Sequence, residues 1–194
     1  MNNLEFKRQS FHFLFGIFIV ILLMYGLIDK WILLYSAIIG IIISFLSTRI
    51  KIPVISWFLQ NFERSEDMEK FPGKGAISYL IGAFLAALFF PMDIAMPSIL
   101  ILAFGDSVSR LFGIHYGKRK HLLNGDKFIE GSVAGFIAAF IGALIFLPWH
   151  EALFASLVAM VVESIELKLG RTQIDDNVVI PLVAGIAIWV VRLF

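Results

Sequence analysis

Seven long apolar stretches constrain this chain more than any other feature. Apolar residues make up 59% of the 194 residues and charged residues only 16%, and a soluble domain of this length could not bury that much apolar surface. A stretch of roughly 20 apolar residues spans a bilayer as a helix, because its backbone polar groups must bond within the segment. The sequence therefore predicts an all-α, polytopic integral membrane protein.

About seven transmembrane helices are expected. They cover residues 10–28, 31–47, 75–91, 94–112, 131–148, 151–167 and 177–192. Two-residue links inside the first, second and third pairs predict antiparallel hairpins. In the second loop, residues 52–62 begin Ile-Pro and carry Trp57 and Phe58 among apolar neighbours, which predicts an interfacial helix in the membrane plane. Residues 1–194 are expected to form a single membrane-embedded domain.

The basic residues are distributed unequally across this arrangement. Of the 16 Lys and Arg residues, two precede the first span, five lie in the second loop, five follow the fourth span and two lie in the last loop. Lys30 and Arg192 remain on the opposite side. The positive-inside rule then predicts that the amino terminus and the three long loops face the cytosol. A formal charge of +1 gives no reason to expect a nucleic acid partner, and the absence of cysteine excludes thiolate metal sites.

Ionisable residues inside the spans are costly and indicate function. Asp106 and Arg110 lie in the cytosolic third of the fourth span, one turn apart, and helical spacing keeps Gly113 on the same face. Glu163 occupies the matching depth of the sixth span, with Glu166 nearer its end. Two acidic spans at one level predict a shallow pocket on the cytosolic side. The alternative is a structural ion pair between Asp106 and Arg110.

The loop after the fourth span has the composition of a phosphate site. Glycines let backbone amides approach an anion, and lysines add charge; here Gly117-Lys118 and later Lys127 supply both. Basic clusters beside a membrane also hold anionic head groups or fix topology, which is the alternative for Arg119 and Lys120. Lys74, in Pro-Gly-Lys-Gly before the third span, could bind a phosphate, although a glycine-rich helix entry explains it better.

Polar residues at two helix starts are further candidates. Asp175-Asp176-Asn177 offers the oxygen ligands that magnesium accepts, but the same residues could cap the seventh span, and both readings stay open. Near the amino terminus, a face with i, i+3, i+7 spacing carries Glu5, Arg8 and His12. Arg8 could clamp a phosphate and Glu5 could hold it in place, whereas a lone histidine there is more often structural.

These fragments recur in one order along almost the whole chain. They are Glu5-x-x-Arg8-x-x-x-His12, Arg64 with Glu66 and Glu69 before Gly73, Gly105-Asp106, Gly113, Gly117-Lys118, Lys127-x-x-Glu130-Gly131, and Asp175-Asp176-Asn177 with Pro181. Together they resemble the CTP-dependent polyprenol and diacylglycerol kinase family, which includes dolichol kinase and phytol kinase. One departure is Gln9, where such kinases often carry a second basic residue.

The resemblance implies transfer of the γ-phosphate of CTP to the hydroxyl of a membrane lipid alcohol, with Mg²⁺ or another divalent cation. From the residues and the resemblance together we predict that Asp106, Glu163, Arg8 and Arg110 are catalytic, with either Glu163 or Asp106 accepting the proton of the hydroxyl. The predicted nucleotide and phosphate ligands are Lys118, Lys127, Gly113, Gly117, Gly131, Lys74 and Arg64. The predicted metal ligands are Asp106, Glu130, Asp175, Asp176 and Asn177, with Glu5 and His12 in support.

Two other functions compete with this reading. Phosphatidate cytidylyltransferases share a Gly-Asp and a Lys-x-x-Glu-Gly arrangement, but a His-Gly-Gly signature would be expected after the sixth span, and residues 170–181 contain no histidine. A small membrane transporter would also bury ionisable groups. Here, however, the acids cluster at one side instead of crossing the bilayer.

Overall fold

The computed structural model describes residues 3–50, 52–121, 124–165, 168–169 and 172–194. Its helices are α1 (Asn3–Met24), α2 (Lys30–Ser47), α3 (Pro53–Phe62), α4 (Ser65–Lys70), α5 (Lys74–Phe89), α6 (Met92–Tyr116), α7 (Ile129–Ala143), α8 (Trp149–Glu163) and α9 (Asp176–Val191). Two-residue strands β1 (Lys168–Leu169) and β2 (Thr172–Gln173) pair antiparallel just before α9.

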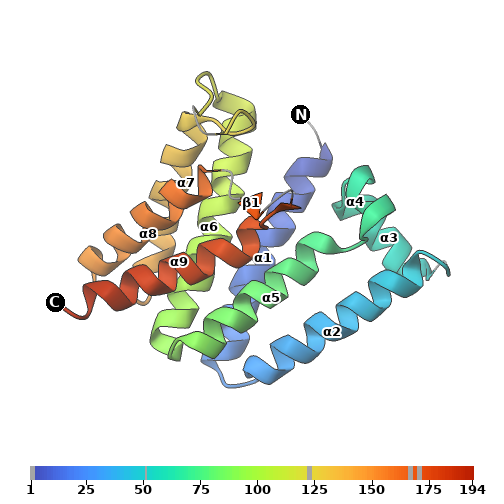
Figure 1. Cartoon of the computed structure of the whole chain (residues 1–194), viewed down its shortest axis with the longest axis horizontal. Coiled ribbons are helices and arrows are strands. Elements are labelled where there is room, and N and C mark those ends of the chain that lie inside the picture. Colours follow the sequence, from blue (N-terminus) through green and yellow to red (C-terminus); the bar gives the residue numbers. More distant parts are fainter. Residues whose placement is uncertain (1–2, 51, 122–123, 166–167, 170–171) are drawn as a thin grey trace.

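Helix α6 lies at the centre of the bundle (Figure 1). It packs against α1, α7 and α9, while α8 covers α7 and α9, and α5 packs between α2 and α9. Most of α6 is buried, whereas α2 has only a few buried side chains and exposes a row of isoleucines. A helix that is apolar on all sides, but buried by protein on only one of them, is typical of a helix in contact with lipid. The chain is therefore a polytopic helical membrane protein.

The seven expected spans correspond to α1, α2 and α5 to α9, and the expected interfacial helix is α3, which begins at Pro53. Three of the seven, α1, α2 and α6, are long and apolar enough to cross a membrane by length and composition. The apolar helices α5, α7 and α9 have 15 or 16 residues, about 22–24 Å of helix. The expected span 131–148 continues beyond the end of α7 at Ala143, because apolar residues extend into the connection, whereas the bounds of 75–91 and 177–192 agree with α5 and α9 to within two residues. Glu166 and Leu167, at the end of the expected sixth span, lie outside the described residues.

Glycines bring α6 and α7 unusually close together. A Cβ built on Gly131 would lie 2.5 Å from the Ser109 carbonyl oxygen, and one on Gly135 would lie 2.7 Å from that of Gly105. Small residues at such a seam let membrane helices pack backbone to backbone. The contact holds Asp106, one residue beyond Gly105, at a fixed depth beside α7.

An ion cluster ties the helix ends at the side of the bundle that the sequence assigns outside. Arg192, which follows α9, donates to Glu151 in α8 at 2.8 Å and also bonds Asp93 in α6. The three helices are thereby joined at the end opposite the polar cavity described next.

Candidate active site

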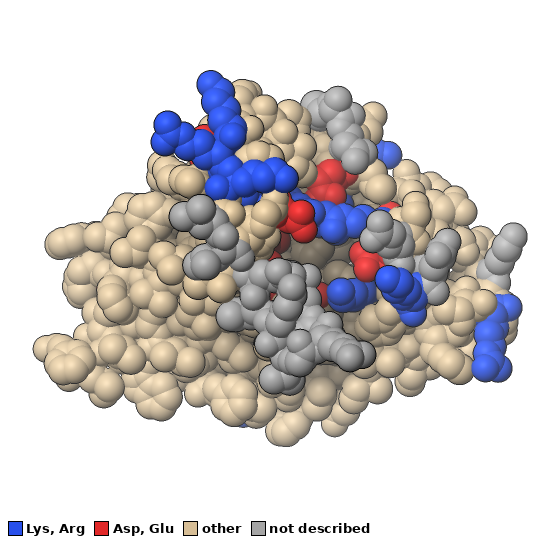
Figure 2. Space-filling model, turned by 45° about the horizontal axis from the view of Figure 1, so that its top comes forward, with Lys and Arg blue, Asp and Glu red and all other residues tan. Residues whose placement is uncertain are grey.

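A polar cavity of about 270 Å³ opens where α1, α5, α7 and α9 begin and α6 and α8 end. Basic and acidic side chains gather around this hollow (Figure 2). The charged residues that line it are Arg8, Glu63, Arg64, Asp67, Lys74, Asp106, Arg110, Asp126, Lys127, Asp175 and Asp176. Both signs of charge therefore meet in one space of the size that a small ligand needs.

Three carboxylates form what we call the acidic cluster: Asp106, Glu163 and Asp176. They come from the second half of α6, the last residue of α8 and the first residue of α9, and one oxygen of each lies within 4.8 Å of the others. Asp106 and Asp176 line the cavity, while Glu163 is buried behind them at 2% exposure. Oxygen ligands at this spacing could hold a divalent cation.

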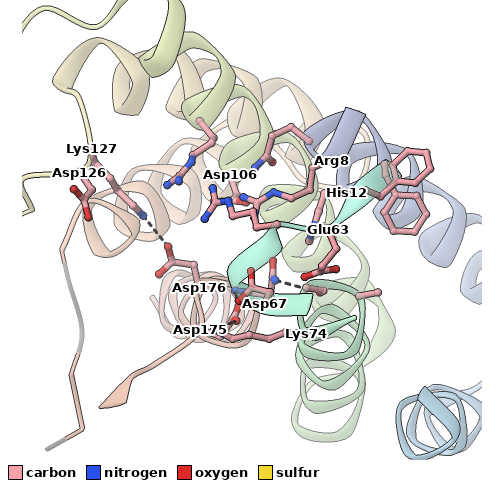
Figure 3. A pocket seen from close by; sticks show the side chains of 18 of the residues that line it. Arg8, His12, Glu63, Asp67, Lys74, Asp106, Asp126, Lys127, Asp175 and Asp176 are labelled. Carbon is pink, nitrogen blue, oxygen red and sulfur yellow. Dashed lines mark hydrogen bonds and ion pairs between the residues drawn. The ribbon is translucent and has the colours of Figure 1, made fainter. Parts of the chain in front are cut away.

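Lys127 lies inside the acidic cluster. Its Nζ is 2.7 Å from Asp176 Oδ2 (Figure 3). The same atom is 2.8 Å from Glu163 Oε1 and also donates to the Glu163 carbonyl. Burial alone would lower the pKa of Lys127, but the carboxylates of Glu163 and Asp176 outweigh it and raise that pKa above its usual value. The lysine is thus held charged, and it neutralises one of three negative charges.

Three arginines surround one buried carboxylate on the other side of the cavity. Glu5 Oε1 accepts from Arg8 at 2.9 Å and lies 3.5 Å from Arg110 Nε, and its other oxygen lies 3.0 Å from Arg64. Gln9 also donates to Glu5 at 3.0 Å. We call Arg8, Arg64 and Arg110 the arginine cluster. One carboxylate leaves it with a surplus of two positive charges facing the cavity.

Arg110 does not form the ion pair with Asp106 that the sequence left open as an alternative. Its guanidinium turns to Glu5, which arrives from α1, because α1 packs along α6 at this level. Asp106 instead faces Glu163 and Asp176. The alternative of a structural Asp106–Arg110 pair is therefore wrong.

The amino-terminal face takes the positions that its spacing suggested. Glu5 holds Arg8 in place, and His12 is 8% exposed and lines the cavity beside Tyr79, with ring centroids 5.5 Å apart. The Nδ1 atom of His12 has no hydrogen-bond partner among the described residues. Gln9, which stands where related kinases often carry a second basic residue, donates its side-chain amide to Glu5.

The start of α9 contains the helix cap that the sequence left open, while magnesium binding there stays a prediction. Asp175 caps the helix by accepting from the Asn177 amide at 3.1 Å, and it lies 3.9 Å from Lys74. The Asn177 side chain donates to Ser78 Oγ at 2.9 Å and ties α9 to α5. Asp175, Asp176, Asn177 and Lys74 all line the cavity. Of these four residues, Asp176 alone belongs to the acidic cluster.

Other predicted residues stand apart from the cavity. Glu130 accepts from the backbone amides of Lys118 and Arg119 at 3.1 and 3.2 Å, and the Lys118 side chain is exposed. The three candidate glycines have packing roles: Gly113 and Gly131 meet at the α6–α7 seam, and Gly117 lies against Phe128. The structure therefore does not bring Lys118, Glu130 and these glycines together with Asp106, because loop ordering and helix packing occupy them.

Several cavity residues carry no special signal in the sequence. Glu63 and Asp67 belong to a charged run that reads as solvated, yet Glu63 is 7% exposed and both line the cavity. Burial, together with the neighbouring charge of Asp67, raises the pKa of Glu63 to about 7. Asn124 and Asp126 join them from the loop before Lys127. Glu63 and Asp67 reach the cavity because α3 and α4 fold over it, and their charged run by itself does not indicate this.

Comparison with known proteins identifies the relatives of this chain. It is 33% identical to an uncharacterised protein of Methanocaldococcus jannaschii over 188 residues, which are 95% of this chain and 92% of that protein. It is 28% identical over 131 residues to phytol kinase 1 of Arabidopsis thaliana, a chloroplast protein. It is 23% identical over 143 residues to CTP-dependent diacylglycerol kinase 1 of Schizosaccharomyces pombe. No protein-family model and no solved structure matches the chain significantly.

These alignments differ in how much of each relative they cover. The match spans 42% of the phytol kinase and 63% of the diacylglycerol kinase, and 59% and 64% of this chain. Relatives of this kind, together with the helical membrane fold, place the chain among membrane-bound phosphotransferases. The resemblance to CTP-dependent lipid kinases that the motifs indicated is therefore confirmed, since the named relatives include two kinases of that kind.

Proposed function

We propose that this protein transfers the γ-phosphate of CTP to the hydroxyl of a membrane lipid alcohol, with Mg²⁺ as cofactor. One observation carries the proposal: the arginine cluster and the acidic cluster face one cavity with opposite surplus charge. A metal–nucleotide complex has the complementary pattern, since its phosphates are anionic and its metal is cationic. The donor is assigned as CTP because two related diacylglycerol kinases are named CTP-dependent.

The arginine cluster would bind the phosphates. Arg8, Arg64 and Arg110 converge on Glu5, which fixes their side chains, and all three line the cavity. The planar guanidinium group matches phosphate oxygens in pairs. Lys74, on the cavity wall at the start of α5, would add a further point charge.

The acidic cluster fits a divalent cation by charge as well as by ligand type. Three carboxylates and Lys127 sum to a surplus of two negative charges, which one Mg²⁺ would balance. Asp106 and Asp176 would hold the ion from the cavity side. When bound, the ion would neutralise phosphate charge as it develops during transfer. Lys127 would stay near the phosphates and keep Asp176 and Glu163 apart.

Glu163 is the group assigned to take the acceptor's proton. Its Oε2 atom is buried and has no hydrogen-bond partner in the described part of the chain, while Ser109 donates to its Oε1 at 3.3 Å. In the transfer, the acceptor oxygen bonds to the γ-phosphorus and the bond from that phosphorus to the β–γ bridging oxygen breaks. CDP leaves with the electron pair, and the hydroxyl proton passes to Glu163. Positioning and charge neutralisation suffice for this chemistry.

The cavity is assigned to the cytosolic face. Fourteen of the 16 Lys and Arg residues fall on the side of the spans where it opens, as the positive-inside rule requires. The cytosol also holds the nucleotide, so donor and site would meet without crossing the bilayer.

The decisive experiment follows the label from CTP. Purified protein is incubated with Mg²⁺, a panel of lipid alcohols that includes phytol, geranylgeraniol, dolichol and diacylglycerol, and CTP labelled at either the α- or the γ-phosphate. The proposal expects γ-label in the lipid product and α-label in CDP. Phosphatidate is tested in parallel, and an α-labelled lipid formed from it, with release of pyrophosphate, would instead identify a cytidylyltransferase. No labelled lipid with any alcohol would overturn the proposal.

A further inference from the structure

A second hollow, an apolar groove of about 300 Å³, runs between α7 and α8. Val133 from α7 and Leu157 and Val161 from α8 line it, with exposed fractions of 54%, 49% and 54%. In a membrane-spanning bundle these side chains face hydrocarbon, so the groove is open to the bilayer along its length. A lipid tail would find there a surface of its own polarity.

The floor of the groove is also a wall of the acidic cluster. Met160 lines the groove, and its sulfur would lie 2.7 Å from a Cβ built on Gly105, the residue before Asp106. Glu163 follows Met160 by one helical turn. The groove and the polar cavity are therefore on two sides of the same few residues of α6 and α8.

One end of the groove is polar, and it is the end next to Glu163. Ser164 donates to Ser132 at 2.8 Å across the α7–α8 contact, and both line the groove. His121 joins them from the preceding loop, and its Nε2 atom is buried without a hydrogen-bond partner in the described residues. Polar groups buried in apolar surroundings need partners. A hydroxyl at this end would supply one.

We propose that the α7–α8 groove binds the tail of the acceptor alcohol and presents its hydroxyl to Glu163 beside Ser132 and Ser164. The inference rests on the proposed function and adds where the second substrate lies. The occupant is a long-chain alcohol because the groove is apolar and open to lipid along its length but polar where it meets the acidic cluster. Donor and acceptor then approach Glu163 from opposite sides, the nucleotide from water and the alcohol from the bilayer.

The first test narrows the groove. Val133→Trp and Leu157→Trp place a large ring in the path of a long tail without touching the polar cavity. With each variant, the KM for geranylgeraniol should rise about tenfold, the equivalent of roughly two methylene groups left unburied. The KM for the shorter geraniol and for CTP should not change. Ile141→Trp is the matched control, because Ile141 lies on α7 at 56% exposure but outside the groove.

The second test does not depend on transfer. A geranylgeraniol analogue with a diazirine at the tail end is photolysed with the wild-type protein, and labelled peptides are mapped. Label on α7 and α8 supports the groove, even if no phosphate transfer is seen and the proposed function fails. Label confined to other helices overturns the groove. It is overturned as well if both Trp variants match Ile141→Trp while wild type transfers phosphate normally.

Discussion

Asp106 and Arg110 lie one turn apart on α6, yet their side chains belong to oppositely charged clusters. Asp106 faces Glu163 and Asp176, while Arg110 lies 3.5 Å from Glu5. One turn of helix, about 5.4 Å, thus joins the proposed metal end of the cavity to the proposed phosphate end. Because α6 packs against α1, α7 and α9, the backbone that carries both residues is held in place between the two clusters.

Asp106→Asn should lower γ-phosphate transfer by about 10²-fold or more, because it removes the charge assigned to hold the metal beside the transferred group. Rates are measured with γ-labelled CTP at saturating Mg²⁺. Asp93→Asn is the control, since Asp93 lies at the opposite end of the same helix with a side chain 65% exposed. Near-normal transfer by Asp106→Asn would remove the metal role from this residue.

Lys127→Ala should make folding depend on a divalent cation. The substitution leaves Glu163 and Asp176 unpaired where the lysine was only 10% exposed, and breaking such a buried pair costs about 3–5 kcal/mol. The melting temperature should fall in EDTA and recover as Mg²⁺ is added. Lys118→Ala, on the exposed part of the same loop, should change neither value. If the melting temperature of Lys127→Ala did not change with Mg²⁺, a cation in the acidic cluster would be contradicted.

CTP with Mg²⁺ should stabilise the wild-type protein by about 2.7 kcal/mol when the nucleotide is present at 100 times its dissociation constant. Arg64→Ala should weaken this gain, because Arg64 is one of three cations assigned to the phosphates. Thermal melts at rising nucleotide concentration measure both effects. Arg49→Ala, an exposed arginine after α2, should behave as wild type, and an equal loss in both variants would point to general charge effects.

The helices were predictable because hydropathy is local, and so was the depth of Asp106 and Glu163. The sequence did not predict which oppositely charged group or backbone amide each charged side chain contacts. Glu130 has the ligand chemistry of the acidic cluster, but it caps two backbone amides of the preceding loop. Arg110 was one turn from a carboxylate on its own helix, but it binds Glu5, 105 positions away along the chain.

Glu63 and Asp67 are cavity residues that the sequence did not predict. Their run of mixed charges, residues 63–70, is indistinguishable in sequence from a solvated loop. The fold turns α3 and α4 over the cavity mouth, so both residues line it. Apolar periodicity could have suggested that α3 docks on the bundle, and the phenylalanines Phe11, Phe58 and Phe62 do meet there. The charges that follow α3 are carried along with it.

Glu63 should make stability fall as pH rises from about 4.5 to about 7. Its carboxyl has a pKa of about 7 in the folded protein, against an ordinary value of 4.5, so between these values the folded state holds a proton that the unfolded state releases. Stability therefore decreases with rising pH across that window. Glu63→Gln should flatten the profile, because the amide resembles the protonated acid and does not titrate. Melting temperatures from pH 4 to 8 test this, with Asp29→Asn as the control, since Asp29 is an exposed cap of α2. An unchanged slope in Glu63→Gln would assign the pH dependence to other groups of the cavity.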